Sequence, residues 1–153
     1  MGHILLDSLH FKVELTYKNA VLDLTFDHLG VIVKSIDKAI PLYLALGYTI
    51  DSEVFCDEQQ QMRGIFLEKS GEPRVELIED LSASKALTKM INAPCGRIYH
   101  LAYRVQNLAE NLDEVLNRLN ARLLSPIKDG CYFKKVCFVF SSDMQILELV
   151  ECK

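Results

Sequence analysis

"FDHLGVIVKSIDKAIPLYL", residues 26–44, decides the fold because the chain repeats it. The stretch aligns without gaps on "IYHLAYRVQNLAENLDEVL", residues 98–116, which lies 72 residues further along the chain. The second part of each stretch carries apolar residues at the same helical spacing, which predicts one amphipathic helix in each copy. At the same offset, "RVELIE" at 74–79 aligns with "ILELVE" at 146–151. Two copies of one unit therefore fill residues 24–151.

Each copy is predicted to fold as a βαβββ module, which makes the chain an α+β protein of two tandem modules. Runs of alternating or continuous apolar residues bounded by turn residues predict the strands. The predicted strands are 26–33, 48–55, 62–68 and 73–80, then 97–105, 121–127, 133–140 and 145–151, and the predicted helices are 36–46 and 108–119. Within one domain we expect an N-terminal arm or extra strand at 1–23, the first module at 24–82, a linker helix at 83–96 and the second module at 97–153.

Composition limits the kinds of partner. Half of the 153 residues are apolar, enough to bury one sizeable core. A net charge of -4 argues against nucleic acid or an anionic membrane as the main partner, because both require a basic face. The five cysteines show no CxxC spacing, which is typical of reduced thiols. Without a secretory signal pattern or a run long enough to span a membrane, the predicted location is cytoplasmic.

Two pairs of polar residues recur at the repeat offset, His28 with His100 and Glu76 with Glu148. All four stand in strands that are otherwise apolar. Successive strand residues point to opposite faces, so each histidine is expected on the face turned away from the aliphatic one that a helix would cover. The same alternation puts Phe26, Gly30 and Ile32 on the face of His28, and Ile98, Ala102 and Arg104 on the face of His100.

A glutamate in an apolar strand needs a partner, because burying an unpaired ionised carboxylate is costly. In one interpretation, each glutamate pairs with an arginine or a protonated histidine, which would give two internal ion pairs and no chemistry. In the other, two imidazoles and two carboxylates converge on one divalent metal that keeps positions open for water or substrate. The recurrence of both residue types at one offset favours the metal. Such a ligand set suits Ni²⁺, Co²⁺, Mn²⁺, Fe²⁺ or Zn²⁺ better than Ca²⁺ or Mg²⁺.

The order and spacing of "DHLGVIVKSIDKAIPLYLALGY", "VELIE", "YHLAYRVQNL" and "LELVE" resemble the vicinal oxygen chelate superfamily. This superfamily includes glyoxalase I, methylmalonyl-CoA epimerase, extradiol dioxygenases and the fosfomycin and bleomycin resistance proteins. The resemblance covers residues 24–152. It implies the glyoxalase-like fold, in which paired βαβββ modules form a cupped mixed sheet with the helices on its outer face. It also places His28, Glu76, His100 and Glu148 at the metal-ligand positions of the glyoxalase and epimerase branches.

The resemblance further implies a metal-dependent isomerase or epimerase that removes a proton next to a thioester or carbonyl through a metal-stabilised enediolate. Glu148 is then the expected base and Glu76 its partner across the substrate. The substrate would be an acyl-CoA thioester or a glutathione hemithioacetal, and the protein a homodimer. "DHLGVIVKSIDKAI" and "YHLAYRV" favour the methylmalonyl-CoA epimerase branch. Glyoxalase I (lactoylglutathione lyase) is the alternative, because some epimerases carry a further carboxylate where this chain has Gly64.

Two questions stay open at the level of sequence. A protein of another class, a metal-free small-molecule binding protein like those for bleomycin resistance, would use the same cup without catalysis. Arg104 shares the predicted face of His100 and could bind a substrate carboxylate through two hydrogen bonds. The same guanidinium could instead neutralise Glu76 or Glu148.

Overall fold

The computed structural model describes residues 22–85, 87, 89, 98–143 and 145–153. The predicted N-terminal arm at 1–23 and linker helix at 83–96 lie largely outside the described residues. Within the described residues, no helix combines the length and the apolar character that crossing a bilayer requires.

Strands and helices follow the same order in both copies. The first copy contains β1 (Thr25–Val33), α2 (Ile36–Ala45), β2 (Thr49–Ile50), β3 (Phe55–Asp57), β4 (Met62–Glu68) and β5 (Val75–Asp80). The second copy contains β6 (Ile98–Arg104), α4 (Leu108–Leu119), β7 (Arg122–Leu123), β8 (Lys128–Asp129), β9 (Lys135–Phe140) and β10 (Ile146–Glu151).

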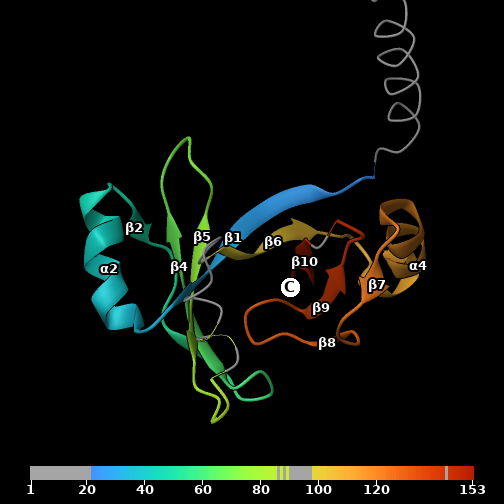
Figure 1. The fold of residues 1–153 in the computed structure, drawn as a ribbon. Helices are drawn as coiled ribbons and strands as arrows, with labels where there is room; N and C mark the ends of the chain where they lie inside the picture. The colour runs from blue at the N-terminus through green and yellow to red at the C-terminus, as the bar shows by residue number, and fades with distance from the viewer. Residues whose placement is uncertain (1–21, 86, 88, 90–97, 144) are drawn as a thin grey trace, which may run out of the picture.

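All ten described strands belong to one mixed sheet, in which eight follow the order β2-β4-β5-β1-β6-β10-β9-β7, while β3 pairs with β4 and β8 pairs with β9. β1 and β6 pair antiparallel at its centre, and each is flanked by a parallel neighbour, β5 or β10. The sheet curves into a cup, and α2 and α4 lie outside it at opposite ends (Figure 1). The predicted fold class is thus confirmed.

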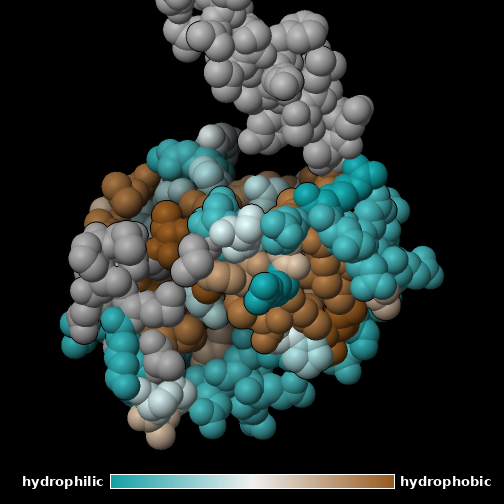
Figure 2. All heavy atoms as spheres, turned by 45° about the vertical axis from the view of Figure 1, so that its right-hand side comes forward, coloured by the Kyte–Doolittle hydropathy of each residue, from teal (hydrophilic) through white to brown (hydrophobic). Residues whose placement is uncertain are grey.

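Each helix covers the aliphatic face of its own module. Ile36 of α2 packs with Leu67 and Leu77, and Leu108 of α4 packs with Leu149, all completely buried. Because burial of such side chains is the main favourable term in folding, these two clusters hold the helices on the sheet. The face shown in Figure 2 also keeps apolar side chains exposed at its middle, with hydrophilic ones around them.

The predicted strands 48–55 and 121–127 are much shorter in the structure: each range holds a two-residue strand, β2 or β7, and a second short strand, β3 or β8, begins at or just after its end. Between β2 and β3, Ser52 accepts a hydrogen bond from the backbone N–H of Phe66 at 2.9 Å. Ser125 accepts the equivalent bond from Phe138 at 3.0 Å. The hydroxyl takes the place of a neighbouring strand's carbonyl, so each edge strand can bend away without leaving a buried N–H unpaired.

The strand pairing between β1 and β6 is irregular at two places. The pairing skips Asp27 on β1, between Phe26 and His28, and skips Tyr99 on β6. An extra residue of this kind is a β-bulge, which turns a side chain to the other face. The predicted alternation is therefore wrong for Phe26, whose ring lies 5.7 Å from that of Tyr103 on the helix-covered side.

A third pair of repeated carboxylates caps the two helices. Glu79 accepts a hydrogen bond from the backbone N–H of Ile36 at 2.8 Å, and Glu151 accepts one from Leu108 at 3.0 Å. The first N–H groups of a helix have no partner within it, and the helix dipole favours negative charge there.

We predict that Glu151→Ala lowers the free energy of unfolding by about 1–2 kcal/mol, because it leaves the buried N–H of Leu108 without an acceptor. Glu79→Ala should have a similar effect on α2. Urea denaturation followed by circular dichroism measures both, and Glu53→Ala, at an exposed position, is the control. Unchanged midpoints in both variants would contradict the capping role.

Candidate metal centre

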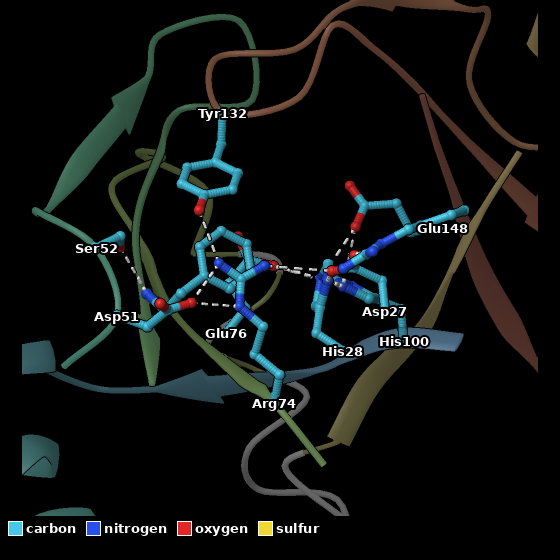
Figure 3. Close-up of polar contacts among 11 residues, drawn as sticks. Asp27, His28, Asp51, Ser52, Arg74, Glu76, His100, Tyr132 and Glu148 are labelled. Atoms are coloured by element: carbon cyan, nitrogen blue, oxygen red, sulfur yellow. Dashed lines mark hydrogen bonds and ion pairs between the residues drawn. The ribbon is translucent and has the colours of Figure 1, made fainter. Parts of the chain in front are cut away.

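Four titratable side chains meet at the buried centre of the sheet. His28 comes from β1, Glu76 from β5, His100 from β6 and Glu148 from β10, so that each of the four central strands contributes one residue (Figure 3). Their exposed fractions are 0%, 6%, 1% and 5%, in that order. One ligand atom from each residue lies within 4.8 Å of the other three. The structure therefore brings together all four residues that the repeat singled out.

The four ligand atoms face a common point. His28 Nε2 lies 3.1 Å from His100 Nε2. Glu148 Oε2 lies 3.2 Å from His28 Nε2 and 3.3 Å from His100 Nε2. Glu76 Oε2 lies 3.3 Å and 3.5 Å from the same two nitrogens. Two nitrogen and two carboxylate donors around one point are a ligand set typical of divalent transition metals.

Carboxylates change the acid–base properties of both rings. Burial alone would lower the pKa of His28, but hydrogen bonds that its ring donates to Asp27, Glu148 and Glu76 outweigh burial and raise the pKa to about 11. Burial would also lower the pKa of His100, but the nearby carboxylates of Glu148 and Glu76 outweigh it, so this pKa is raised too. Glu148 shows the converse, since burial would raise its pKa but the two histidines lower it to about 2.

An ion-paired cluster of protonated histidines leaves polar atoms unsatisfied. Two protonated rings would point N–H donors at each other across 3.1 Å. Among the described residues, the buried Glu148 Oε2 has no well-directed hydrogen bond although two histidine nitrogens lie 3.2 and 3.3 Å away, and the buried His100 Nδ1 has no hydrogen-bond partner. A bare buried acceptor costs about 1–3 kcal/mol. A cation at the common point would satisfy the inward-facing atoms of all four residues at once, so these residues fit a divalent metal.

Gly30 makes room for His100. Gly30 pairs with His100 across the β1–β6 ladder, and a Cβ atom at this position would overlap the imidazole ring. Gly64 on β4 has a similar role, because a Cβ there would overlap the ring of Phe55 and press on Glu76. Both glycines are explained by the close approach of site side chains to the backbone.

A cavity of about 300 Å³ opens next to the cluster, and we call it the cup cavity. Glu76, His100 and Glu148 form its base. Its walls include the residues Phe55, Asp57, Gln60, Tyr99, Lys128, Tyr132 and Phe138. The cavity is small and lined by both apolar and polar side chains, and such a concave site can hold a small molecule.

Arg104 does not reach this cavity. Its Nε donates a hydrogen bond to Asp27 Oδ2, and the two residues line a second cavity together with Arg74 and Tyr132. Of the two roles left open for Arg104, the ion pair with Glu76 or Glu148 is replaced by an ion pair with Asp27. The β-bulge in β1 brings that carboxylate to the interior.

Sequence reasoning missed Asp27 and Tyr99. Asp27 Oδ1 lies 2.7 Å from His28 Nδ1, and Tyr99 lines the cup cavity with its ring 5.2 Å from that of His100. Burial, with Glu148 and Glu76 adding to it, raises the pKa of Tyr99, which keeps the phenol protonated as a donor. Each of the two residues directly precedes a histidine of the repeat, and this position in the sequence could have identified them as site residues.

The chain belongs to the glyoxalase/bleomycin resistance protein/dioxygenase superfamily, whose family model matches residues 27–140. Among solved structures, a hypothetical protein from Bacillus halodurans is 26% identical, with a TM-score of 0.74 over 86% of this chain and 96% of that one. No curated protein matches the sequence.

Methylmalonyl-CoA epimerases are also similar in structure. The enzyme from Mycobacterium tuberculosis is 25% identical, with a TM-score of 0.71 over 84% of this chain and 87% of that one. A Streptomyces coelicolor epimerase, solved in complex with 2-nitronate-propionyl-CoA, is 19% identical, with a TM-score of 0.68 over 83% of this chain and 96% of that one. At that identity the second likeness shows the fold alone.

We predict that Gly30→Ala weakens metal binding by about tenfold or more, because the added methyl group must displace the His100 ring. Metal content after dialysis, measured by elemental analysis, tests this. Val31→Ala is the control, since it removes apolar volume from the next position of β1 without touching that ring. Equal metal content in Gly30→Ala and the unmodified protein would show that His100 does not hold the metal.

Proposed function

We propose that this protein is a metal-dependent isomerase or epimerase that removes a proton next to a carbonyl, with a methylmalonyl-CoA-like thioester as the best substrate. The observation that carries the proposal is the four-residue cluster at the base of the cup cavity. Membership of the superfamily and the likeness to an epimerase at 25% identity support it.

His28, Glu76, His100 and Glu148 would hold one ion, with Ni²⁺, Co²⁺, Mn²⁺, Fe²⁺ and Zn²⁺ as candidates. When bound, such an ion supplies Lewis-acid polarisation of a carbonyl oxygen and stabilises the negative charge that proton removal creates. The burial of the four side chains strengthens this effect, because charges interact more strongly away from water.

A carboxylate must also accept the proton. Glu76 and Glu148 stand on β5 and β10, which flank the two histidine strands, so they approach a substrate from opposite sides. Glu148 is the proposed base: its side chain lines the cup cavity, and the low pKa of this carboxyl keeps it ionised. Glu76 is its proposed partner in returning the proton.

The size of the cavity agrees with a small reacting unit. About 300 Å³ is at the lower end of ligand-pocket volumes, so the cup would enclose the acyl part of a thioester and leave the carrier outside. Water is then kept from the reacting carbon while the large carrier portion of the thioester remains solvated.

One observation favours glyoxalase I-like chemistry as a second candidate. Some epimerases carry a further carboxylate on the third strand, but here that position is Gly64, and Phe55 fills the space beside it. Among the described residues of β4, Met62 is the one that lines the cup cavity, so this strand contributes no acid or base there. A glutathione hemithioacetal, whose proton would move between adjacent carbons, needs only the two glutamates.

Metal-free binding of a small molecule is the alternative from another class. The unsatisfied atoms of the cluster speak against it, because a protein that only sequesters a ligand gains nothing from burying them. The homodimer and the cytoplasmic location stay predictions.

We predict near-stoichiometric divalent metal in the purified or metal-supplemented protein, and turnover of methylmalonyl-CoA in preference to the methylglyoxal–glutathione hemithioacetal. Elemental analysis and parallel assays of one metal-loaded preparation measure both. Turnover of the hemithioacetal alone would move the assignment to the glyoxalase I branch. A protein that takes up no metal would contradict the proposal.

We expect Glu148→Gln to lower kcat by about 10²–10⁴-fold, the usual contribution of a general base. Binding of substrate should weaken much less, which isothermal titration can show. Glu53→Gln, at an exposed position, provides the control. If Glu148→Gln turns over at the original rate, Glu148 is not the base.

A further inference from the structure

Asp27 is a buried carboxylate that contacts three side chains of the protein, those of His28, Arg74 and Arg104. Its side chain is 0% exposed. Oδ1 lies 2.7 Å from His28 Nδ1 and 3.4 Å from Arg74 Nη1, while Oδ2 accepts a hydrogen bond from Arg104 Nε. Such a charge is stable inside a protein only when it is paired and hydrogen-bonded.

This contact with His28 depends on the irregular strand pairing. Consecutive strand residues normally point to opposite faces, which would send Asp27 and His28 apart. The bulge between Phe26 and His28 lets both side chains turn inward. The aspartate thereby reaches the outer nitrogen of the same ring whose inner nitrogen faces the cluster.

A carboxylate in this place fixes the ring. Because Asp27 accepts a hydrogen bond from Nδ1–H, the free lone pair of the neutral ring lies on Nε2. That atom faces His100, Glu76 and Glu148. Asp27 also restricts rotation of the imidazole and makes it a better electron donor toward a bound ion.

Two guanidinium groups hold the aspartate from its other side. Arg104 and Arg74 line the second cavity, of about 530 Å³, with Asp27 between them and His28. Arg74 is itself held by Asp51 at 2.6 Å and by the hydroxyl of Tyr132 at 2.7 Å (Figure 3). The aspartate is thus fixed by groups that lie away from the four-residue cluster.

The internal repeat shows that only one histidine is supported in this way. The residue equivalent to Asp27 in the second copy is Tyr99. His100 Nδ1 is buried and lacks a hydrogen-bond partner among the described residues. The two imidazoles therefore differ although their strands repeat.

We infer that Asp27 is a positioning residue that makes His28 the anchoring ligand of the metal, and that Arg104 acts by holding Asp27 and not by binding substrate. This inference rests on the metal site of the proposed function. It assigns the arginine a role at a distance from the reacting atoms.

Asp27→Asn tests the inference without any substrate. We expect its affinity for Zn²⁺ and Co²⁺ to fall by about 10–100-fold in competition with a chromophoric chelator. The visible absorption of the Co²⁺-loaded protein should also change, because the donor strength of His28 changes. Asp51→Asn is the matched control, since it too removes a carboxylate from Arg74 at the second cavity but does not contact a histidine.

Arg104 gives an independent variant if Asp27→Asn folds poorly, because half of its side chain is exposed. Arg104→Gln should weaken metal binding in the same direction by a smaller factor, and Arg104→Lys should restore part of it. Its KM for substrate should stay near that of the unmodified enzyme.

The outcomes separate the two proposals. If the unmodified protein binds metal and both Asp27→Asn and Arg104→Gln match it in affinity and Co²⁺ spectrum, this inference is overturned while the metal site stands. If Arg104→Gln instead raises KM and leaves metal affinity unchanged, Arg104 is a substrate residue. A protein that binds no metal overturns both.

Discussion

The structure depends on the burial of two imidazoles and two carboxylates around one point. Charged and polar groups of this kind are costly to remove from water unless each finds a partner. The strand order β5-β1-β6-β10 brings together one such group from each strand, with the two glutamates flanking the two histidines. The antiparallel pairing of β1 with β6 is what joins the modules into one sheet, and it is also what places the histidine nitrogens 3.1 Å apart.

The internal repeat includes both structural devices and the four-residue cluster. The cap at the start of each helix recurs, as does the serine beside each short edge strand, so these features serve the fold of the module. Two positions next to the recurring histidines differ between the copies. Asp27 and Tyr99 occupy equivalent places with different chemistry, one behind a histidine and the other in the cup cavity. A site built from two like halves becomes asymmetric in this way.

The repeat made the fold and the four-residue cluster predictable, because a shared offset needs no knowledge of how strands pair. The positions of Asp27, Tyr99 and Arg104 were not predictable in the same way. Strand alternation assumes regular pairing, and a bulge is decided jointly by two strands that are distant in sequence. A substrate carboxylate and a glutamate of the cluster were the two partners considered for Arg104, but the bulge supplied Asp27 as its carboxylate partner. The short edge strands were missed because a serine hydroxyl can replace a backbone acceptor without changing the apolar pattern.

Charge balance also indicates the kind of ion that the centre suits. With neutral imidazoles, the site holds three negative charges, those of Asp27, Glu76 and Glu148. Arg104 neutralises one of them, whereas the charge of Arg74 is taken up by Asp51. The remaining deficit equals two positive charges. In the absence of metal, two imidazolium protons can fill it, and the carboxylates accordingly raise the pKa of both rings. A divalent cation fills the same deficit from one central point and avoids opposing two N–H donors. Metal and protons therefore compete for one site, and the arrangement of the donors favours the metal.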